Sequence, residues 1–284
     1  MDYHIIGMGP VGLLLATLLK DEGHQVTLIS RQTLTSPIKE LVKINAQGQQ
    51  HHYQIHQTTW DQLDSTGIQT VLICTKAQDA YDAFQRSPKT ANKIFLNNGM
   101  GPQQLAWEQQ SRTVYWGSNT HGCYIDKAGL LVHAGEGTLL VGSPNRITPV
   151  LTLASCFQWS VNIEQILWNK LSINALINPL TLKYDCMNGD LLNNEQAIEW
   201  MEKLGRELDV LRVSKQVFDT PSFDMAIKVA KATKNNWSST IQDVRANKRT
   251  ELDFICTYAQ RTAQSLRIKT PALDAILDEL RPFL

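Results

Sequence analysis

Apolar residues in the first part of the chain occur in short runs separated by glycine-rich or polar turns. Four of these runs have the length and composition of buried strands: Tyr3–Ile6, Gln25–Ile29, Thr70–Cys74 and Lys93–Leu96. Between the strands, Val11–Leu19 and Asp79–Arg86 have the length of helices. Strands that alternate with helices predict a parallel sheet with helices packed on its faces.

The pattern changes between Thr113 and Gly142, where short alternating segments are separated by turns at 126–129 and 135–137. This change predicts antiparallel strands that extend the parallel sheet. The polar segment Gln47–Gln57 has the character of an edge hairpin. A helix around Pro149–Phe157 and a last strand near Val161 are expected to complete a first domain, residues 1–163.

After Ile163 the sequence has the periodicity of helices. Apolar residues recur at helical spacing in one long stretch, at Ile198, Met201, Leu204, Leu208 and Leu211. Thr220-Pro221 and Thr270-Pro271 predict helix starts, with threonine as the cap and proline at the first helical position. Residues 164–284 are expected to form an all-helical second domain, so the predicted fold class is α/β, with a Rossmann-type first domain and an all-α second.

A glycine turn connects the first predicted strand to the first helix, and its contacts are expected from Gly7, Met8, Gly9, Pro10, Val11 and Gly12. Gly7 permits the tight turn, Gly9 lets the backbone approach a pyrophosphate, and Gly12 allows the helix to pack closely on the strand. The phosphates would lie at the helix N-terminus. The turn predicts a dinucleotide site, and the alternative is a glycine turn that binds nothing.

The end of the second predicted strand indicates which nucleotide is bound. NAD-binding domains usually carry an acidic residue there, which accepts hydrogen bonds from the ribose 2′-hydroxyl. This chain has Ser30, Arg31 and Gln32 instead. A guanidinium and a hydroxyl can bind a 2′-phosphate, so the sequence favours NADP. The alternative is that Arg31 is a solvated surface residue.

Polar side chains follow the next two strands. Lys76 comes directly after the third strand and Asn98 after the fourth. The carboxyl ends of parallel strands face the ligand in an open sheet, so both residues are expected at one crevice. Taken singly, each has a simpler explanation, as an exposed lysine and as part of an Asn-Gly turn.

One helix of the second domain carries a polar stripe. Lys170, Asn174 and Asn178 are spaced four residues apart, so they project from the same side of a helix. The neighbouring positions are mostly apolar, which suggests that this helix is buried on its other sides. Burying an ammonium and two amides without partners would cost several kcal/mol, so the stripe is expected to face a wet cleft. The alternative is a surface stripe.

Composition narrows the classes of function. The 27 basic and 27 acidic side chains cancel over 284 residues, so nothing marks the chain as a binder of nucleic acid or of membranes. The N-terminus lacks the pattern of a signal peptide, and we expect a cytoplasmic protein. The five cysteines form no C-x-x-C pair and are expected to be reduced thiols. No metal site is expected, although His51, His52 and His56 lie close together in sequence.

At these motifs the chain resembles the ketopantoate reductase (2-dehydropantoate 2-reductase) family. The resemblance covers the glycine turn, Arg31, Thr75–Ala77, Asn98–Gly101, Thr120-His121, the string from Lys170 through Asn174 and Asn178 to Thr181, Asn188-Gly189, Ser238–Asp243 and Arg249–Glu251. The lysine–asparagine–asparagine–proline string is the most specific of these. The family's fold is a Rossmann domain joined to a helical domain, with the active site in the cleft between them.

The resemblance implies NADPH-dependent reduction of ketopantoate to (R)-pantoate, a step towards pantothenate and coenzyme A. It implies that the glycine turn, Arg31 and Lys76 hold NADPH and that Asn98, Cys123 and Glu251 lie beside the cofactor. It also implies that Lys170 is the proton donor. The residues that it places around the substrate are Lys170, Asn174, Asn178, Asn188, Asn236, Ser238 and Ser239.

The chemistry supports this assignment from the residues themselves. Hydride transfer to a ketone leaves negative charge on the oxygen, which requires a cation and a proton source. Lys170 can supply both, and Glu251 can hold its ammonium. Two alternatives remain: another NAD(P)-dependent dehydrogenase that acts on a different 2-oxo acid or an opine-like substrate, and a catalytically silent NADP sensor. The sequence leaves open whether the protein is a monomer or a homodimer.

Overall fold

The computed structural model describes residues 1–64, 66–144, 148 and 151–283. The chain divides into two compact units. The first unit comprises Met1–Asn97 and Pro102–Ile163, and the second comprises Asn98–Gly101 and Glu164–Leu284. The segment Asn98–Gly101 therefore belongs to the helical unit, although it directly follows a strand of the first.

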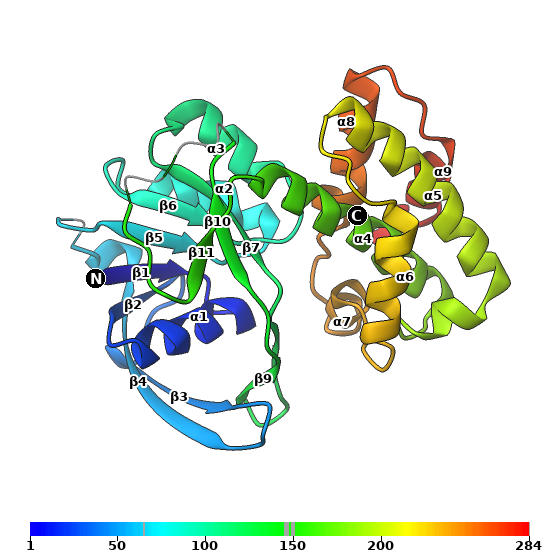
Figure 1. Cartoon of the computed structure of the whole chain (residues 1–284). Coiled ribbons are helices and arrows are strands. Elements are labelled where there is room, and N and C mark those ends of the chain that lie inside the picture. The colour runs from blue at the N-terminus through cyan, green and yellow to red at the C-terminus, as the bar shows by residue number, and fades with distance from the viewer. Residues whose placement is uncertain (65, 145–147, 149–150, 284) are drawn as a thin grey trace. The chain divides into compact units, whose positions relative to one another are not determined.

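The described strands of the first unit form one eleven-stranded sheet in the order β11-β10-β7-β6-β5-β1-β2-β4-β3-β9-β8 (Figure 1). They are β1 (Asp2–Ile6), β2 (Gln25–Ser30), β3 (Ile38–Ile44), β4 (Gln50–Thr59), β5 (Thr70–Ile73), β6 (Asn92–Phe95), β7 (Val114–Asn119), β8 (Gly122–Ile125), β9 (Leu131–Gly135), β10 (Leu139–Gly142) and β11 (Phe157–Trp159). The centre of the sheet consists of five strands in the order β2-β1-β5-β6-β7. Each of these strands pairs in parallel with the next. This arrangement confirms the predicted Rossmann-type core.

The described part of the first unit also contains three helices and a 3-10 turn: α1 (Pro10–Asp21), α2 (Ala77–Arg86), α3 (Pro102–Gln110) and η1 (Trp60–Gln62). Figure 1 shows α1 on one face of the sheet and α2 and α3 on the other. The run Leu13–Leu15 on α1 is buried in the core together with Tyr3 and Ile5 of β1. Gly23, with φ +79°, lies in the turn after α1, where a left-handed residue suits the end of a helix.

The predicted antiparallel extension is confirmed, because β10 pairs antiparallel with β7 and β8 pairs antiparallel with β9. A hairpin is present, formed by β3 and β4, but the predicted segment Gln47–Gln57 supplies only part of its turn and most of its second strand, and the first strand lies earlier in the chain. The expected position of the hairpin at the edge was wrong, because β9 adds to β3 at Lys43 and Ile44. Sequence periodicity could not reveal this neighbour, since β9 lies far along the chain and contributes only a short parallel pairing.

The helix expected around Pro149–Phe157 was wrong over the residues that can be compared. Pro149 and Val150 lie outside the described residues. Leu151–Cys156 is irregular and turn-like, and β11 begins at Phe157. The apolar residues that suggested a helix instead pack on the sheet core, where Ala154 is buried and its amide donates to the Tyr3 hydroxyl (2.8 Å). Tertiary packing therefore overrides the weak local preference for a helix.

The second unit is helical. Its elements are α4 (Ile163–Tyr184), α5 (Glu195–Ser214), α6 (Ser222–Ala232), α7 (Ser239–Arg245), α8 (Tyr258–Ser265), α9 (Pro271–Glu279), the 3-10 turns η2 (Asp190–Asn193) and η4 (Arg281–Phe283), and a π-helical turn, η3 (Asp253–Thr257). Most of the predicted stripe on α5 is buried, with Ile198 half-buried. Pro271 opens α9 as predicted, whereas Pro221 caps α6 from outside the helix. No helix in the described part of the chain is long and apolar enough to cross a membrane.

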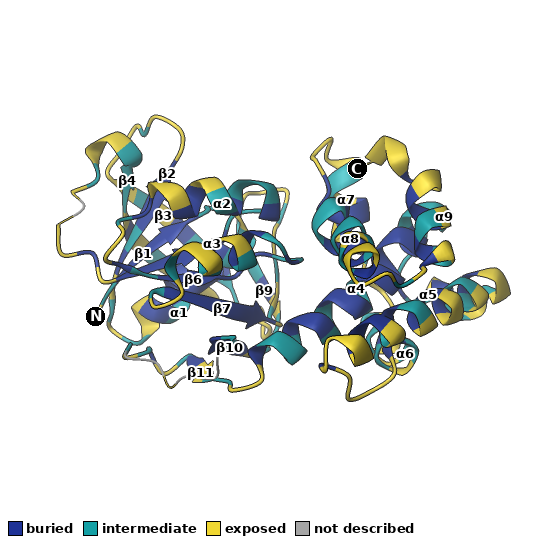
Figure 2. Cartoon of the chain, turned by 90° about the horizontal axis from the view of Figure 1, so that it is seen from above, coloured by how far each residue is buried: buried dark blue, intermediate teal, exposed yellow. Residues whose placement is uncertain are grey.

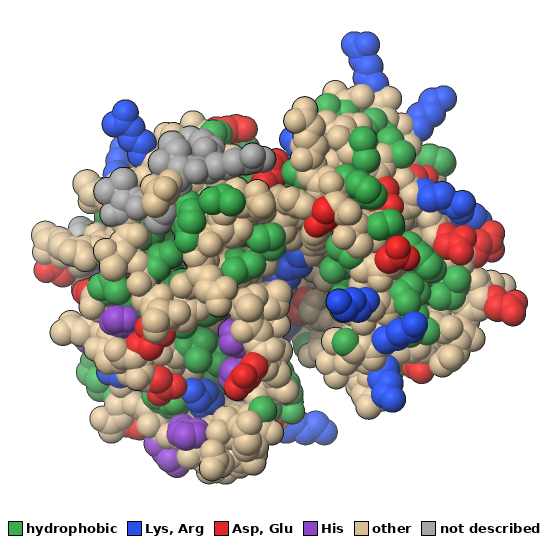
Figure 3. All heavy atoms as spheres, in the orientation of Figure 1, with side chains coloured by type: hydrophobic (Ala, Val, Ile, Leu, Met, Phe, Trp, Pro, Cys, Tyr) green, Lys and Arg blue, Asp and Glu red, His purple; other side chains and the backbone are tan. Residues whose placement is uncertain are grey.

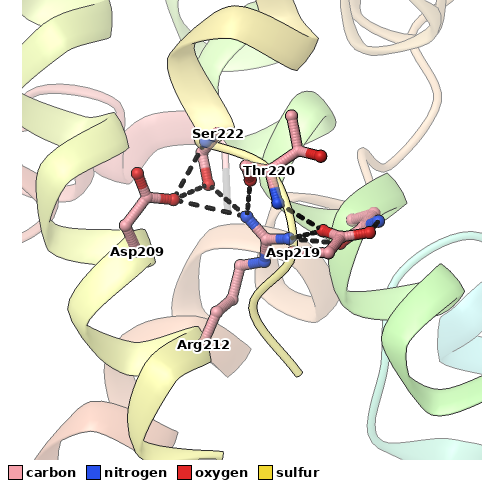
Figure 4. Close-up of polar contacts among 6 residues, drawn as sticks. Asp209, Arg212, Asp219, Thr220 and Ser222 are labelled. Carbon is pink, nitrogen blue, oxygen red and sulfur yellow. Dashed lines mark hydrogen bonds and ion pairs between the residues drawn. The ribbon is translucent and has the colours of Figure 1, made fainter. Parts of the chain in front are cut away.

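A buried arginine connects α4, α5 and the turn before α6. Arg212 has no exposed side-chain surface, and its guanidinium donates to Asp219 (2.8 Å), the Thr220 carbonyl (2.7 Å) and Asn169 (Figure 4). Asp209 accepts from Arg212 (3.3 Å) and from the Ser222 hydroxyl (2.6 Å). Because Asn169 directly precedes Lys170, this network fixes α4 at the turn that carries the lysine.

Candidate active site

The glycine turn has the geometry of a phosphate cradle. Gly7 has φ +107°, and a Cβ atom there would lie 2.6 Å from the Cys74 backbone. A Cβ at Gly12 would lie 1.9 Å from the Gly7 carbonyl oxygen, so only glycine lets α1 approach β1 this closely. A Cβ at Gly9 would meet nothing within 4 Å, so the backbone at the start of α1 faces open space. These features fit a pyrophosphate at the helix N-terminus.

Arg31 directly follows β2 at the same edge of the sheet. Its guanidinium forms an ion pair with Asp79 in the first turn of α2 (3.0 Å), and its side chain is 62% exposed. The Ser30 hydroxyl is already engaged, because it accepts from the Gln32 amide (3.0 Å) and lies 3.0 Å from the Gln32 carbonyl oxygen. Both groups expected to bind a 2′-phosphate therefore already have partners, and Arg31 is the more accessible of the two because Ser30 is buried.

Two further cofactor candidates lie in the first unit. Lys76 precedes α2 and is half-buried, which places it at the carboxyl end of β5 as expected. Cys123 lies on β8, opposite His133 of β9. Burial raises the pKa of the Cys123 thiol to about 11, so the thiol is neutral near pH 7 and contributes contact surface rather than charge.

In the second unit, Lys170 and Glu251 are electrostatically coupled. Lys170 is half-buried on α4, whereas Glu251 is only 7% exposed just before η3. Burial lowers the pKa of Lys170 below its ordinary value, and the Glu251 carboxylate partly opposes this change. Glu251 is therefore not an exposed surface carboxylate. A lysine with a lowered pKa is a stronger acid than a free lysine, so its ammonium gives up a proton more readily.

The segment Asn98–Gly101 brings a further amide to Glu251. Asn98 Nδ2 donates to Glu251 Oε2 (3.1 Å), and the Met100 amide donates to the Phe254 carbonyl (2.8 Å). Gly99 has φ +73°, and a Cβ there would lie 2.4 Å from the Phe254 carbonyl oxygen. Sequence reasoning assigned Asn98 to a crevice with Lys76, whereas the structure gives it a partner in the helical unit. Phe254 and its π-helical turn left no recognisable signal in the sequence.

Asn178 and Asn188 each have a buried side-chain atom without a hydrogen-bond partner among the described residues. Asn178 is 4% exposed and Asn188 is 8% exposed, and the atoms concerned are Asn178 Nδ2 and Asn188 Oδ1. Leaving such atoms unpaired costs about 1–3 kcal/mol each, so a bound polar molecule or water explains them best. Asn174, one turn from Lys170, is half-buried.

The residues expected near the substrate after α6 divide into two groups. Ser238 is buried, caps α7 through the Ile241 amide (3.3 Å) and accepts from the Thr181 hydroxyl (2.8 Å). Asn236 and Ser239 are exposed. Sequence reasoning did not select Thr181 as a site residue, although its position three residues after Asn178 on one helix would place the two side by side. Thr181 links α4 to the start of α7.

The described residues contain no group of three or more side chains suited to a metal ion. His51 and His52 are exposed on β4 and His56 is exposed beside them, in line with the surface hairpin. All five cysteines are free thiols.

On the face shown in Figure 3, basic and acidic side chains are interspersed on both units, which agrees with the balanced composition. Figure 2 shows that most of α4 is buried, so the polar stripe lies on an otherwise apolar helix.

Comparison with known proteins connects these features to one family. The model of the ketopantoate reductase PanE/ApbA family matches residues 3–146, and the model of its C-terminal domain matches residues 162–283. A 2-dehydropantoate 2-reductase from Vibrio cholerae is 30% identical over 99% of this chain and 97% of its own length.

Solved structures share the fold. A PanE/ApbA family ketopantoate reductase from Ralstonia eutropha has a TM-score of 0.82 at 22% identity and covers 100% of this chain and 98% of its own. A D-mandelate dehydrogenase in complex with NADH and anilino(oxo)acetate has a TM-score of 0.84 at 16% identity, over 99% of this chain and 98% of its own. From the two family models, which together span most of its length, the chain belongs to the ketopantoate reductase family of oxidoreductases.

Proposed function

We propose that this protein reduces ketopantoate to (R)-pantoate with NADPH, as a step in the synthesis of pantothenate and coenzyme A. Residues 1–163 would then be the nucleotide-binding domain and residues 164–284 the substrate domain. The observation that carries the proposal is the position of Lys170 on the same helix as Asn174 and Asn178. Burial lowers the pKa of Lys170, and the Glu251 carboxylate partly opposes this change and so favours the charged ammonium. A protein that only sensed nucleotides would have no use for this arrangement.

Each residue has a definite task in this reaction. NADPH supplies the hydride when it is bound. Lys170 places its ammonium at the ketone oxygen, stabilises the negative charge that develops there and donates a proton to it. Glu251 keeps that ammonium charged and is itself held by Asn98. The buried Asn178 Nδ2 can donate to the substrate carboxylate, and the Asn188 Oδ1 can accept from its hydroxyl.

The cofactor assignment rests on the first unit. Gly7 and Gly12 create the close approach of α1 to β1, and the open space at Gly9 leaves room for the pyrophosphate. Arg31 is the residue proposed to bind a 2′-phosphate, Lys76 lies at the carboxyl end of β5, and Cys123 lies on β8. The D-mandelate dehydrogenase of similar fold was solved with NADH, which supports a nicotinamide cofactor for this chain.

A substrate panel tests the proposal. NADPH oxidation is followed at fixed enzyme concentration with ketopantoate, with pyruvate, with an opine-forming pair of 2-oxo acid and amino acid, and with phenylglyoxylate, the 2-oxo acid that corresponds to mandelate. Ketopantoate should give the highest kcat/KM. A higher value for another 2-oxo acid would replace ketopantoate as the substrate, and turnover of none of them would favour the sensor.

The side chain of Asn178 should be required for substrate recognition. Asn178→Ala is expected to lower kcat/KM for ketopantoate at least about tenfold, because a positioned donor to a charged group contributes about 1.5–3 kcal/mol. Thermal stability should change little, because the deleted Nδ2 has no partner among the described residues. Steady-state kinetics and a melting curve check this, with Asn169→Ala as a contrasting variant because Asn169 belongs to the Arg212 network. A large fall in Tm for Asn178→Ala with near-normal kinetics would make Asn178 a core residue instead.

Arg31 should determine the affinity for NADPH. Arg31→Ala removes a charge-assisted contact worth about 1.5–3 kcal/mol, so the Kd for NADPH should rise roughly ten- to a hundredfold. The Kd for NADH should change little, since NADH lacks the 2′-phosphate. Titration of each nucleotide by fluorescence measures both constants. Equal losses for NADH and NADPH would show that Arg31 does not contact the 2′ position.

A further inference from the structure

The adenosine end of the proposed nucleotide site contains an acid that sequence reasoning did not consider. β1 pairs in parallel with both β2 and β5, so the residues that follow β2 and β5 lie at the same edge of the sheet. Arg31 follows β2, and Asp79 lies in the first turn of α2, shortly after β5. Their side chains meet at 3.0 Å between Arg31 Nη1 and Asp79 Oδ2.

This pair leaves the position that discriminates between nucleotides nearly neutral. Asp79 is the only ion-pair partner that Arg31 has in the described part of the chain. The second polar group that could bind a phosphate, the Ser30 hydroxyl, is engaged by Gln32. Arg31 therefore meets a 2′-phosphate while a carboxylate already shares its guanidinium.

We propose that Asp79 competes with the 2′-phosphate of NADPH for Arg31 and so reduces the preference of this protein for NADPH over NADH. The inference rests on the proposed nicotinamide cofactor. The two side chains are 62% and 35% exposed, and such solvent-exposed ion pairs are weak, so a phosphate can displace the carboxylate. The displaced carboxylate stays within several ångströms of a phosphate that carries about −1.5 to −2 charge, and the two repel each other. NADH has no such phosphate and avoids the repulsion.

The test measures nucleotide affinity directly. NADPH and NADH are titrated against the full-length protein by fluorescence, and 2′,5′-ADP and 5′-AMP are titrated as fragments that differ in the 2′-phosphate. Asp79→Asn removes the charge and keeps the shape. It should tighten NADPH and 2′,5′-ADP about three- to tenfold and leave NADH and 5′-AMP within about twofold. Asp79→Ser, which also suits the first turn of a helix, should give the same result.

Two controls isolate the pair. Asp82→Asn removes the same charge from the same helix, but Asp82 pairs with Arg86 (3.1 Å), so NADPH affinity should stay within about twofold. In an Arg31→Ala background, Asp79→Asn should tighten NADPH by less than it does when Arg31 is present, because the competition for Arg31 is gone and only the repulsion between carboxylate and phosphate is relieved. Arg31→Ala alone should bind NADH better than NADPH, since Asp79 then remains as an acceptor for the ribose 2′-hydroxyl.

The results separate the inference from the proposed function. If the wild-type protein binds neither NADH nor NADPH, the proposed function fails and the inference fails with it. If it binds a nucleotide but Asp79→Asn leaves NADPH affinity unchanged or weakens it, the inference alone is overturned, and Asp79 serves to position Arg31. The inference is also overturned if Asp79→Asn tightens NADPH equally with and without Arg31.

Discussion

Replacing Lys170 with alanine is expected to lower kcat for ketopantoate about 10²–10⁴-fold, the range associated with the loss of a general acid. Nucleotide affinity should remain, because the glycine turn and Arg31 belong to the first unit and Lys170 to the second. Lys170→Arg should restore little activity, since a guanidinium stays protonated near neutral pH and its planar fork does not replace a compact ammonium. Lys183→Ala, on the same helix, is the control and should keep normal turnover.

The pH profile tests the same lysine independently. Burial lowers the pKa of Lys170, so kcat/KM of the wild-type protein should fall with rising pH before the ordinary lysine pKa of about 10.4 is reached. The Glu251 carboxylate raises that pKa, so Glu251→Gln should move the falling limb to lower pH. The limb should be absent from the residual activity of Lys170→Ala. Turnover of Lys170→Ala at the wild-type rate would remove the lysine from the mechanism.

The largest loss of stability is expected at Arg212. Arg212→Met removes a fully buried guanidinium and leaves Asp209 and Asp219 together without their cation. Breaking a fully buried charge pair costs about 3–5 kcal/mol, and because the Asp209 and Asp219 side chains are 23% and 39% exposed, the free energy of unfolding should fall by an amount at or below the lower end of this range. Urea denaturation followed by circular dichroism measures it. Arg206→Ala is the matched control on α5, because Arg206 is 72% exposed and pairs with Glu202 at 3.8 Å, so its effect should stay within about 0.5 kcal/mol.

Lowering the pH should reduce the difference in free energy of unfolding between the wild-type protein and Arg212→Met. Burial raises the pKa of Asp219, but hydrogen bonds from Asn169 and the Thr220 amide and the charge of Arg212 outweigh it, so the net pKa is lowered. A lowered pKa contributes stability above the unfolded value of about 3.9, and this contribution is lost as the pH falls through the folded value. The gap in unfolding free energy should therefore be widest near neutral pH. A gap that stayed constant down to pH 2 would show that lost packing, and not charge, is responsible.

The sequence by itself determined the features that depend on neighbours along the chain. The strand before Gly7, the helix after it and the stripe of Lys170, Asn174 and Asn178 follow from periods of two and 3.6 residues and from the conformational freedom of glycine. The division between a sheet and a set of helices also follows from these periods. The family motifs added roles for single residues, which the structure alone does not assign.

Only the tertiary structure decided which side chains meet. Asn98 and Glu251 are 153 positions apart, and their hydrogen bond depends on how the segment around Gly99 packs on Phe254. The pairing of Arg31 with Asp79 requires β2 and β5 to flank β1, which no local pattern encodes. Leu151–Cys156 has apolar residues that suit a helix, yet burial against the sheet core decides its conformation, because packing energies exceed local propensities of a few tenths of a kcal/mol per residue.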